Sequence, residues 1–196
     1  MKKPLFLSLA FAGLALATTG LNAQTSTWTI DTAHSSANFQ IRHMAVSTVR
    51  GSIGGVKGTV TLDEKDITKS IVAATLETAT VTTGTEARDK HLKSPDFFDV
   101  AKNPQIVFKS TAITGAPGSL KLTGDLTLAG VTKSITLDVD GPSAPQKNQK
   151  GIMISGFSAT GKFNRKDFEF GTKSTASAAI GDEVKFTIDV EIDKQP

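Results

Sequence analysis

The chain has 196 residues, no cysteine, no tyrosine and a formal net charge of +3. This length suits one domain with a processed end. The absence of cysteine excludes a disulfide framework, a thiolate zinc site and a Cys nucleophile. Basic residues are spread along the chain with acids between them, so we expect no nucleic-acid partner.

The first 23 residues are predicted to be a secretory signal peptide. Lys2 and Lys3 form a basic start, 5–17 is an apolar run, and Ala23 offers a small residue for cleavage. Cleavage after Ala17 is an alternative. The apolar run is too short to span a bilayer core of roughly 30 Å, and no second run follows, which disfavours the alternatives of a membrane anchor or a buried helix. We expect an exported protein, periplasmic or secreted.

Cleavage after Ala23 changes the charge balance. The mature chain, 24–196, loses Lys2 and Lys3 and no acid, so 20 basic residues against 19 acidic ones leave +1. It holds no integral membrane segment, no internal repeat and no interdomain linker. We therefore expect one nearly neutral domain.

Period-2 alternation of apolar and polar residues recurs along the mature chain and predicts strands with one buried face. The last segment is the clearest, because apolar residues from Val184 to Ile192 alternate with polar ones. The predicted strands are 28–30, 34–43, 49–62, 70–83, 105–113, 120–128, 131–139, 151–163 and 184–192. Around eight or nine strands without a long helix indicate an all-β barrel or sandwich.

One segment between the strands has helical features. Thr83 and Glu86 have the spacing of a capping box, and Ser94-Pro95 is typical of a helix start, followed by Phe97 and Phe98. A short helical crossover with two adjacent phenylalanines is interpreted as a lid or end plug. The alternative is a plain corner whose phenylalanines complete the core.

Few residues could carry chemistry. The chain has no Gly-rich phosphate loop, no HExxH and no GxSxG motif. His34, His43 and His91, with Asp31 and Asp89 nearby in sequence, could assemble a metal site, since imidazole and carboxylate suit several transition metals. In the simpler interpretation Asp31 orients His34 and Asp89 caps or pairs locally within the helix. We therefore predict no metal site.

His43 follows the inward parity of Ala37, Phe39 and Ile41 on its strand, so it is expected to point inward near a barrel end, with Arg42 outward or over the rim. One interpretation is a buried histidine bonded to the backbone. The other is a polar group that meets a ligand head group at the mouth of an apolar cavity.

Four segments together resemble the YceI-like family of exported bacterial proteins, also called polyisoprenoid-binding proteins. The resemblance as a whole extends over about 28–192, almost the whole mature chain. The segments are Trp28-x-Ile30-Asp31-x-x-His34-Ser35 continuing to Phe39-x-Ile41-Arg42-His43, Arg88-Asp89-x-His91-Leu92 with Asp96-Phe97-Phe98-Asp99 and Asn103-Pro104-x-Ile106-x-Phe108, Gly124-Asp125-Leu126-Thr127-Leu128 with Gly130-Val131-Thr132-Lys133, and Asn164-Arg165-Lys166-Asp167-Phe168.

The resemblance implies an extended, lipocalin-like, eight-stranded antiparallel barrel around an elongated apolar cavity, with a short helical crossover. The ligand would be a long-chain amphiphile such as a polyisoprenoid, an isoprenoid quinone or a fatty acid or amide, with no other cofactor. Residues expected at the tail are Phe39, Ile41, Phe97, Phe98, Phe108, Phe157, Phe163 and Phe168. Residues expected at the polar end are Arg42, His43, Asp89 and His91.

Three functions follow from this pattern. The first is non-catalytic binding or transport of the amphiphile in the bacterial envelope. The second is metal-assisted hydrolysis, which requires His34, His43 and His91 to converge. The third is a stress-linked envelope interaction protein whose cavity is incidental. A homodimer through an exposed strand edge is compatible with each of them.

Overall fold

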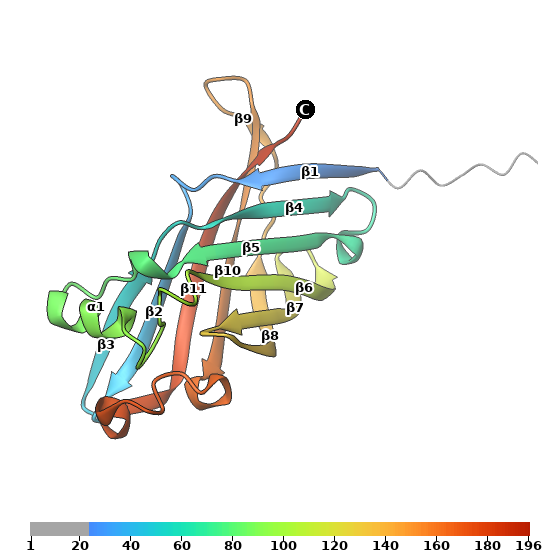
Figure 1. Ribbon diagram of the computed structural model, residues 1–196. Coiled ribbons are helices and arrows are strands. Elements are labelled where there is room, and N and C mark those ends of the chain that lie inside the picture. Colours follow the sequence, from blue (N-terminus) through green and yellow to red (C-terminus); the bar gives the residue numbers. More distant parts are fainter. Residues whose placement is uncertain (1–23) are drawn as a thin grey trace, which may run out of the picture.

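The computed structural model describes residues 24–196, and the predicted leader lies outside this part of the chain. Its eleven strands form one antiparallel sheet, and eight of them close into a barrel because β10 pairs with β11 as well as with β8 (Figure 1). The barrel strands are β1 (Thr25–Ile30), β4 (Lys57–Asp63), β5 (Ile71–Glu77), β6 (Gln105–Ala116), β7 (Ser119–Leu128), β8 (Val131–Asp140), β10 (Met153–Asn164) and β11 (Ile180–Lys194). The predicted all-β, eight-stranded antiparallel barrel is confirmed.

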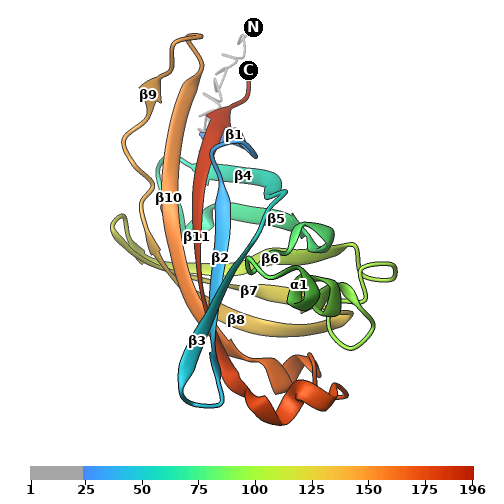
Figure 2. The same ribbon diagram turned by 90° about the vertical axis from the view of Figure 1, so that its left-hand side faces the viewer.

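A hairpin of β2 (Ser36–His43) and β3 (Ser47–Ile53) makes the barrel longer on one side. The edge of β11 pairs with β1 only at Ile192–Lys194 and then with β2 from Asp189 to Ile180. The hairpin therefore continues downward along the lower half of β11, past the end of the barrel's shorter strands (Figure 2). This arrangement accounts for the extended shape expected from the family.

Burial alternates along the strands as the sequence pattern requires. In β7, Leu120, Leu122, Leu126 and Leu128 are buried, whereas the residues between them are mostly exposed or half-buried. One face of each strand therefore looks into a single apolar interior, which supplies the driving force for closing the sheet.

The predicted strand 49–62 is wrong, because it is two strands. The chain breaks at Gly54-Gly55, where Gly55 has a φ of +64°, a conformation that few other residues adopt at low cost. The Gly54 N–H donates to Thr80 Oγ1 (2.8 Å) rather than to a neighbouring strand. The periodicity of the apolar residues continued across this break and concealed it.

The predicted strand 70–83 ends early, at Glu77, and a 3₁₀ turn (Thr78–Thr80) follows. Thr78 is fully buried and its hydroxyl donates to the carbonyl of Asn103 (2.7 Å), which fixes the start of the crossover. The remaining short elements are β9 (Gln146–Lys147), between the predicted strands 131–139 and 151–163, and 3₁₀ turns at Ile67–Lys69, Arg165–Phe168 and Thr175–Ala179.

The predicted helical crossover is present as α1 (Glu86–Lys93), beside β3 at the lower end of the barrel (Figures 1 and 2). Its start differs from the expected capping box. Thr85 is the N-cap and makes no side-chain cap bond, while the Asp89 carboxylate accepts the Thr83 backbone N–H (2.7 Å). No helix between residues 24 and 196 has the length and apolar character needed to cross a bilayer.

Candidate functional site

The barrel encloses a cavity of about 460 Å³. Strands β2, β3, β5–β8, β10 and β11 contribute to its wall, and α1 covers part of it. Most of the lining side chains are aliphatic or aromatic, such as Val72, Leu76 and Leu122. This size lies within the range of about 300–1,000 Å³ common for small-molecule sites, and the apolar lining suits a hydrocarbon chain.

Glycines on neighbouring strands keep the phenylalanine rings against the wall. Phe39 pairs with Gly51 across β2 and β3, and Phe186 pairs with Gly161 across β10 and β11. A Cβ on Gly51 would lie 2.4 Å from the Phe39 ring, and one on Gly161 would lie 2.7 Å from the Phe186 ring. Each ring therefore uses the space of a missing side chain, which leaves the centre of the barrel open.

An aromatic cluster closes part of the lower end. The Phe170 ring contacts Phe98 (centroids 4.7 Å apart) and Phe97 (5.5 Å), and Phe97 also meets the His91 ring edge-on at 5.1 Å. All four residues line the cavity. The crossover thus brings its two adjacent phenylalanines into both the core and the cavity wall. Their place in the core is confirmed, and a lid role for this segment stays a prediction.

The polar groups of the wall gather at the same end. Arg42 donates from Nη1 to Thr48 Oγ1 (2.8 Å) and from Nη2 to the Ala45 carbonyl (2.6 Å). His91 Nε2 donates to Asp96 Oδ2 (2.8 Å). Arg42, His43 and Ser47 are exposed and also line the cavity, so they mark its mouth at the end of the β2–β3 hairpin.

Ten of the twelve predicted ligand residues line this cavity. They are Phe39, Ile41, Arg42, His43, His91, Phe97, Phe98, Phe108, Phe157 and Phe163. This places them together around one space, while their contact with a ligand stays a prediction. His43 lies on the wall near a barrel end, as its parity indicated, and it is exposed there, so the interpretation of it as a buried histidine is wrong.

Asp89 and Phe168 lie away from the cavity. Asp89 accepts hydrogen bonds from Thr82 and Thr83, and these bonds, Thr83's above all, hold the pKa of its carboxyl below the ordinary value. Its role is therefore to fasten the start of α1. Phe168 is buried behind Phe163, with ring centroids 5.1 Å apart, because the 3₁₀ turn points it into the core.

The sequence prediction missed many of the lining residues, among them Arg88, Arg165 and Phe170. Arg88 precedes His91 by three residues and Leu92 by four, so helical spacing could have placed it on their face. Arg165 and Phe170 belong to a loop with no periodicity, and nothing in the sequence signals where it folds back.

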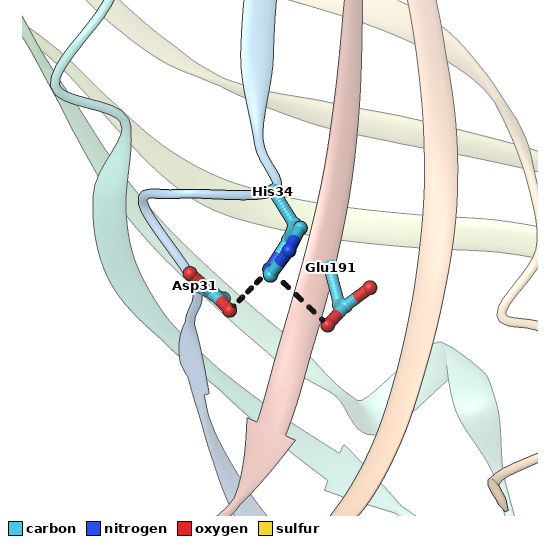
Figure 3. A group of neighbouring side chains, drawn as sticks. All are labelled: Asp31, His34 and Glu191. Carbon is cyan, nitrogen blue, oxygen red and sulfur yellow. Dashed lines mark hydrogen bonds and ion pairs between the residues drawn. The ribbon is translucent and has the colours of Figure 1, made fainter. Parts of the chain in front are cut away.

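Asp31, His34 and Glu191 form a compact group where the β1–β2 corner crosses β11 (Figure 3). His34 Nδ1 donates to Asp31 Oδ2 (2.7 Å) and lies 3.7 Å from Glu191 Oε1. The hydrogen bond from His34 lowers the Asp31 pKa, and the same bond raises the His34 pKa. Asp31 therefore orients His34, as the simpler interpretation of the motif predicted.

These three residues are the one group in residues 24–196 whose donor atoms are close enough, within 4.8 Å, to share a cation. A cation there would displace the proton that joins His34 to Asp31. His43 and His91 belong to no such group within the same residues, so the convergence required for a hydrolytic metal centre is not observed there.

Comparison with known proteins agrees with this geometry. The model of the YceI-like domain matches residues 28–192, which is most of the described chain. The chain belongs to the YceI-like family. Among relatives of this YceI-like chain, the protein named YceI from Salmonella agona is 39% identical over 97% of both chains.

Two solved structures show the same barrel. The YceI protein of Campylobacter jejuni is 30% identical to this YceI-like chain, with a TM-score of 0.68 over 79% of this chain and 90% of that one. A polyisoprenoid binding domain from Saccharophagus degradans has a TM-score of 0.62 over 86% of this chain and 98% of that domain. At 14% identity, the second likeness concerns the fold alone.

Proposed function

We propose that this YceI-like protein is a non-catalytic carrier that binds a long-chain amphiphile in its barrel, in the periplasm or outside the cell. The amphiphile is a polyisoprenoid, an isoprenoid quinone or a fatty acid or amide. The observation that carries the proposal is the cavity of about 460 Å³, apolar along its length and polar at one end. The name of the S. degradans neighbour, a polyisoprenoid binding domain with the same barrel, supports the choice of ligand class.

The energetics favour a long chain. Burial of a methylene contributes roughly 0.8 kcal/mol, so a ten-carbon tail contributes about 8 kcal/mol in total. Association costs about 4–15 kcal/mol before any polar group is desolvated, which leaves a short tail with little affinity. A tail of about twenty carbons or more has a clear surplus by the same arithmetic. The site has few polar anchors, so chain length must supply the affinity.

The proposal is tested by titrating delipidated protein with decanoic, hexadecanoic and eicosanoic acid. We expect affinity to increase with length, by up to about fourfold per methylene, until the cavity is filled. Two adjacent alanines of β5 offer a matched pair of variants, because Ala74 lines the cavity and Ala73 does not. Ala74→Phe fills part of the cavity and is expected to abolish the increase of affinity with the length of the fatty acid. Ala73→Phe is expected to retain this increase. Affinity that is independent of length in the unmodified protein would contradict the proposal.

A further inference from the structure

Apolar side chains are exposed at the tip of the β2–β3 hairpin, where nothing in the described chain covers them. Met44 is 65% exposed and Val46 is 83% exposed. The described residues contain two other exposed large hydrophobic side chains, Ile71 and Ile152, and each stands alone. The tip, at the lower end of the molecule (Figure 2), thus carries two of the four exposed large apolar side chains of the described residues.

The backbone of the tip is unfavourable for the residues that occupy it. The Val46 N–H donates to the His43 carbonyl (3.0 Å), and the two residues between them, Met44 and Ala45, have φ values of +49° and +56°. This is a type I′ turn, which favours Asn-Gly, since residues with larger side chains are strained at positive φ. Stability of the hairpin therefore does not explain an apolar residue here.

The tip adjoins the mouth of the cavity. His43 and Ser47, which flank it, line the cavity, and the Met44 N–H donates to the carbonyl of Ala179 (2.8 Å), another lining residue. In both views the tip lies at the lower end of the barrel beside the segment that leads into β11 (Figures 1 and 2). A chain that enters or leaves through this mouth passes the exposed Met44 and Val46.

The hairpin carries positive charge with no acid of its own. Residues 36–53 contain Arg42 and Arg50 and no Asp or Glu. Neither arginine takes part in an ion pair within residues 24–196. The acids on the neighbouring segment have other partners, since Asp182 is paired with Arg165 and Lys166, and Glu183 is paired with Lys162 and Lys185. Arg42 is also tied to the tip through the Ala45 carbonyl. Exposed apolar residues next to unpaired cations fit the interface of an anionic bilayer.

We propose that the hairpin tip docks the protein on an anionic lipid surface, with Met44 and Val46 inserted among the head groups and Arg42 beside lipid phosphates, so that the cavity mouth faces the bilayer. This inference rests on the proposed function, because the docked mouth is the route by which the amphiphile passes between membrane and barrel. We propose the lipid surface itself as the binding partner of the tip. The experiment also detects the alternative partner, a second copy of the chain.

The test measures flotation of the purified protein with vesicles of phosphatidylethanolamine and phosphatidylglycerol, and with vesicles of phosphatidylcholine. The intact mass of each purified protein shows which residue the chain begins with. All variants are prepared with the same first residue. We expect binding to the anionic vesicles, weakened by salt, and at least about tenfold weaker binding for the double variant Met44→Asn, Ala45→Gly. Because Asn-Gly suits this turn, that variant folds with an equal or higher melting temperature.

Two further variants strengthen the design. Val46→Thr keeps the shape of the side chain and is expected to weaken anionic-vesicle binding by about threefold, through loss of apolar contact alone. Ile71→Asn removes an exposed apolar residue from β5, remote from the hairpin, and is expected to bind as the unmodified protein does. Equal binding by all variants, or none by the unmodified protein, would overturn docking. So would a tip variant that changes only the oligomeric state, which would assign the tip to a second copy.

Solvent extraction of each variant separates this inference from the proposed function. We expect the tip variants to retain the lipid content of the unmodified protein, since Met44 and Ala45 do not line the cavity. Bound lipid without vesicle binding would overturn docking and leave the carrier function standing. Vesicle binding without lipid in any preparation would overturn the carrier function and leave a docking surface.

Discussion

Arg165 shows how one side chain organises the lower end of the barrel. It is 1% exposed, and its guanidinium donates to the carbonyls of Phe170, Ser177, Ile180 and Gly181 at 2.9–3.1 Å. A buried cation is tolerated because these dipoles replace its hydration. The loop between β10 and β11, which contains two 3₁₀ turns, is thus fastened at four backbone carbonyls by one side chain.

Arg165→Met is therefore predicted to lower the free energy of unfolding by about 2–5 kcal/mol, because it leaves several buried carbonyls without a donor. Denaturant titration gives the value. Lys166→Met is the matched control, since the Lys166 side chain is 55% exposed and is expected to change stability by no more than about 0.5 kcal/mol. Equal effects of the two substitutions would contradict this role of Arg165.

Asp31 and His34 couple the β1–β2 corner to pH. The hydrogen bond raises the His34 pKa above its ordinary value of 6.5. The contribution of His34 to the free energy of unfolding is therefore complete below pH 6.5 and is lost as pH rises through the higher pKa of the folded state. The same bond lowers the Asp31 pKa below 3.8. The contribution of Asp31 to the free energy of unfolding is therefore present above pH 3.8 and is lost as pH falls through the lower pKa of the folded state. Both contributions are present together between these limits.

Asp31→Asn is predicted to move the His34 pKa back toward 6.5, because it removes the acceptor carboxylate that stabilises the imidazolium. NMR titration of the three histidines measures this directly, with His43 and His91 as internal references. A His34 pKa that is the same in both proteins would show that the pair does not form in solution.

At the scale of elements, the pairing of phenylalanine with glycine across strands keeps the cavity open. A Cβ on Gly161 would meet the Phe186 ring at 2.7 Å and Leu137 Cδ2 at 2.6 Å, and both side chains line the cavity. The sequence contains these residues but gives no sign of which glycine faces which ring, because that depends on strand register.

Gly161→Ala is predicted to lower stability by about 1–3 kcal/mol through overpacking and to reduce lipid content by pushing Phe186 into the cavity. Gly54→Ala is the control, since its Cβ would meet Thr80 at an ordinary 3.6 Å. Calorimetry and solvent extraction of both variants provide the comparison. Unchanged lipid content in Gly161→Ala would show that the ring does not border the ligand.

The elements also show which parts of the fold could be predicted from sequence. Alternation in 120–128 and 184–192 predicted β7 and much of β11, because burial on one face leaves a period of two. The same signal continued across Gly54-Gly55 and hid a break that is set by backbone conformation. Strand residues such as Phe39 and Phe108 line the cavity, as parity indicates, whereas Asp89 in α1 and Phe168 in a 3₁₀ turn do not line it, because strand parity gives no information on such segments.

At the scale of the whole molecule, the barrel has no covalent cross-link, since the chain contains no cysteine. Its stability comes from the sheet and its interior, and a ligand that binds only the folded state adds to it by linkage. Delipidated protein is therefore predicted to melt roughly 5–10 °C lower than protein at a ligand concentration of about 100 times Kd, where linkage contributes about 2.7 kcal/mol. Scanning calorimetry before and after delipidation checks this, and identical melting temperatures would contradict it.

The central claim is that the barrel holds a long-chain amphiphile, and mass spectrometry of the purified protein tests it most directly. The intact protein under native conditions and its organic extract are compared with the Ala74→Phe variant prepared in parallel. We predict one class of long-chain lipid, near one molecule per chain, in the unmodified protein and its loss in the variant. An extract with no lipid beyond that of the variant would contradict the claim.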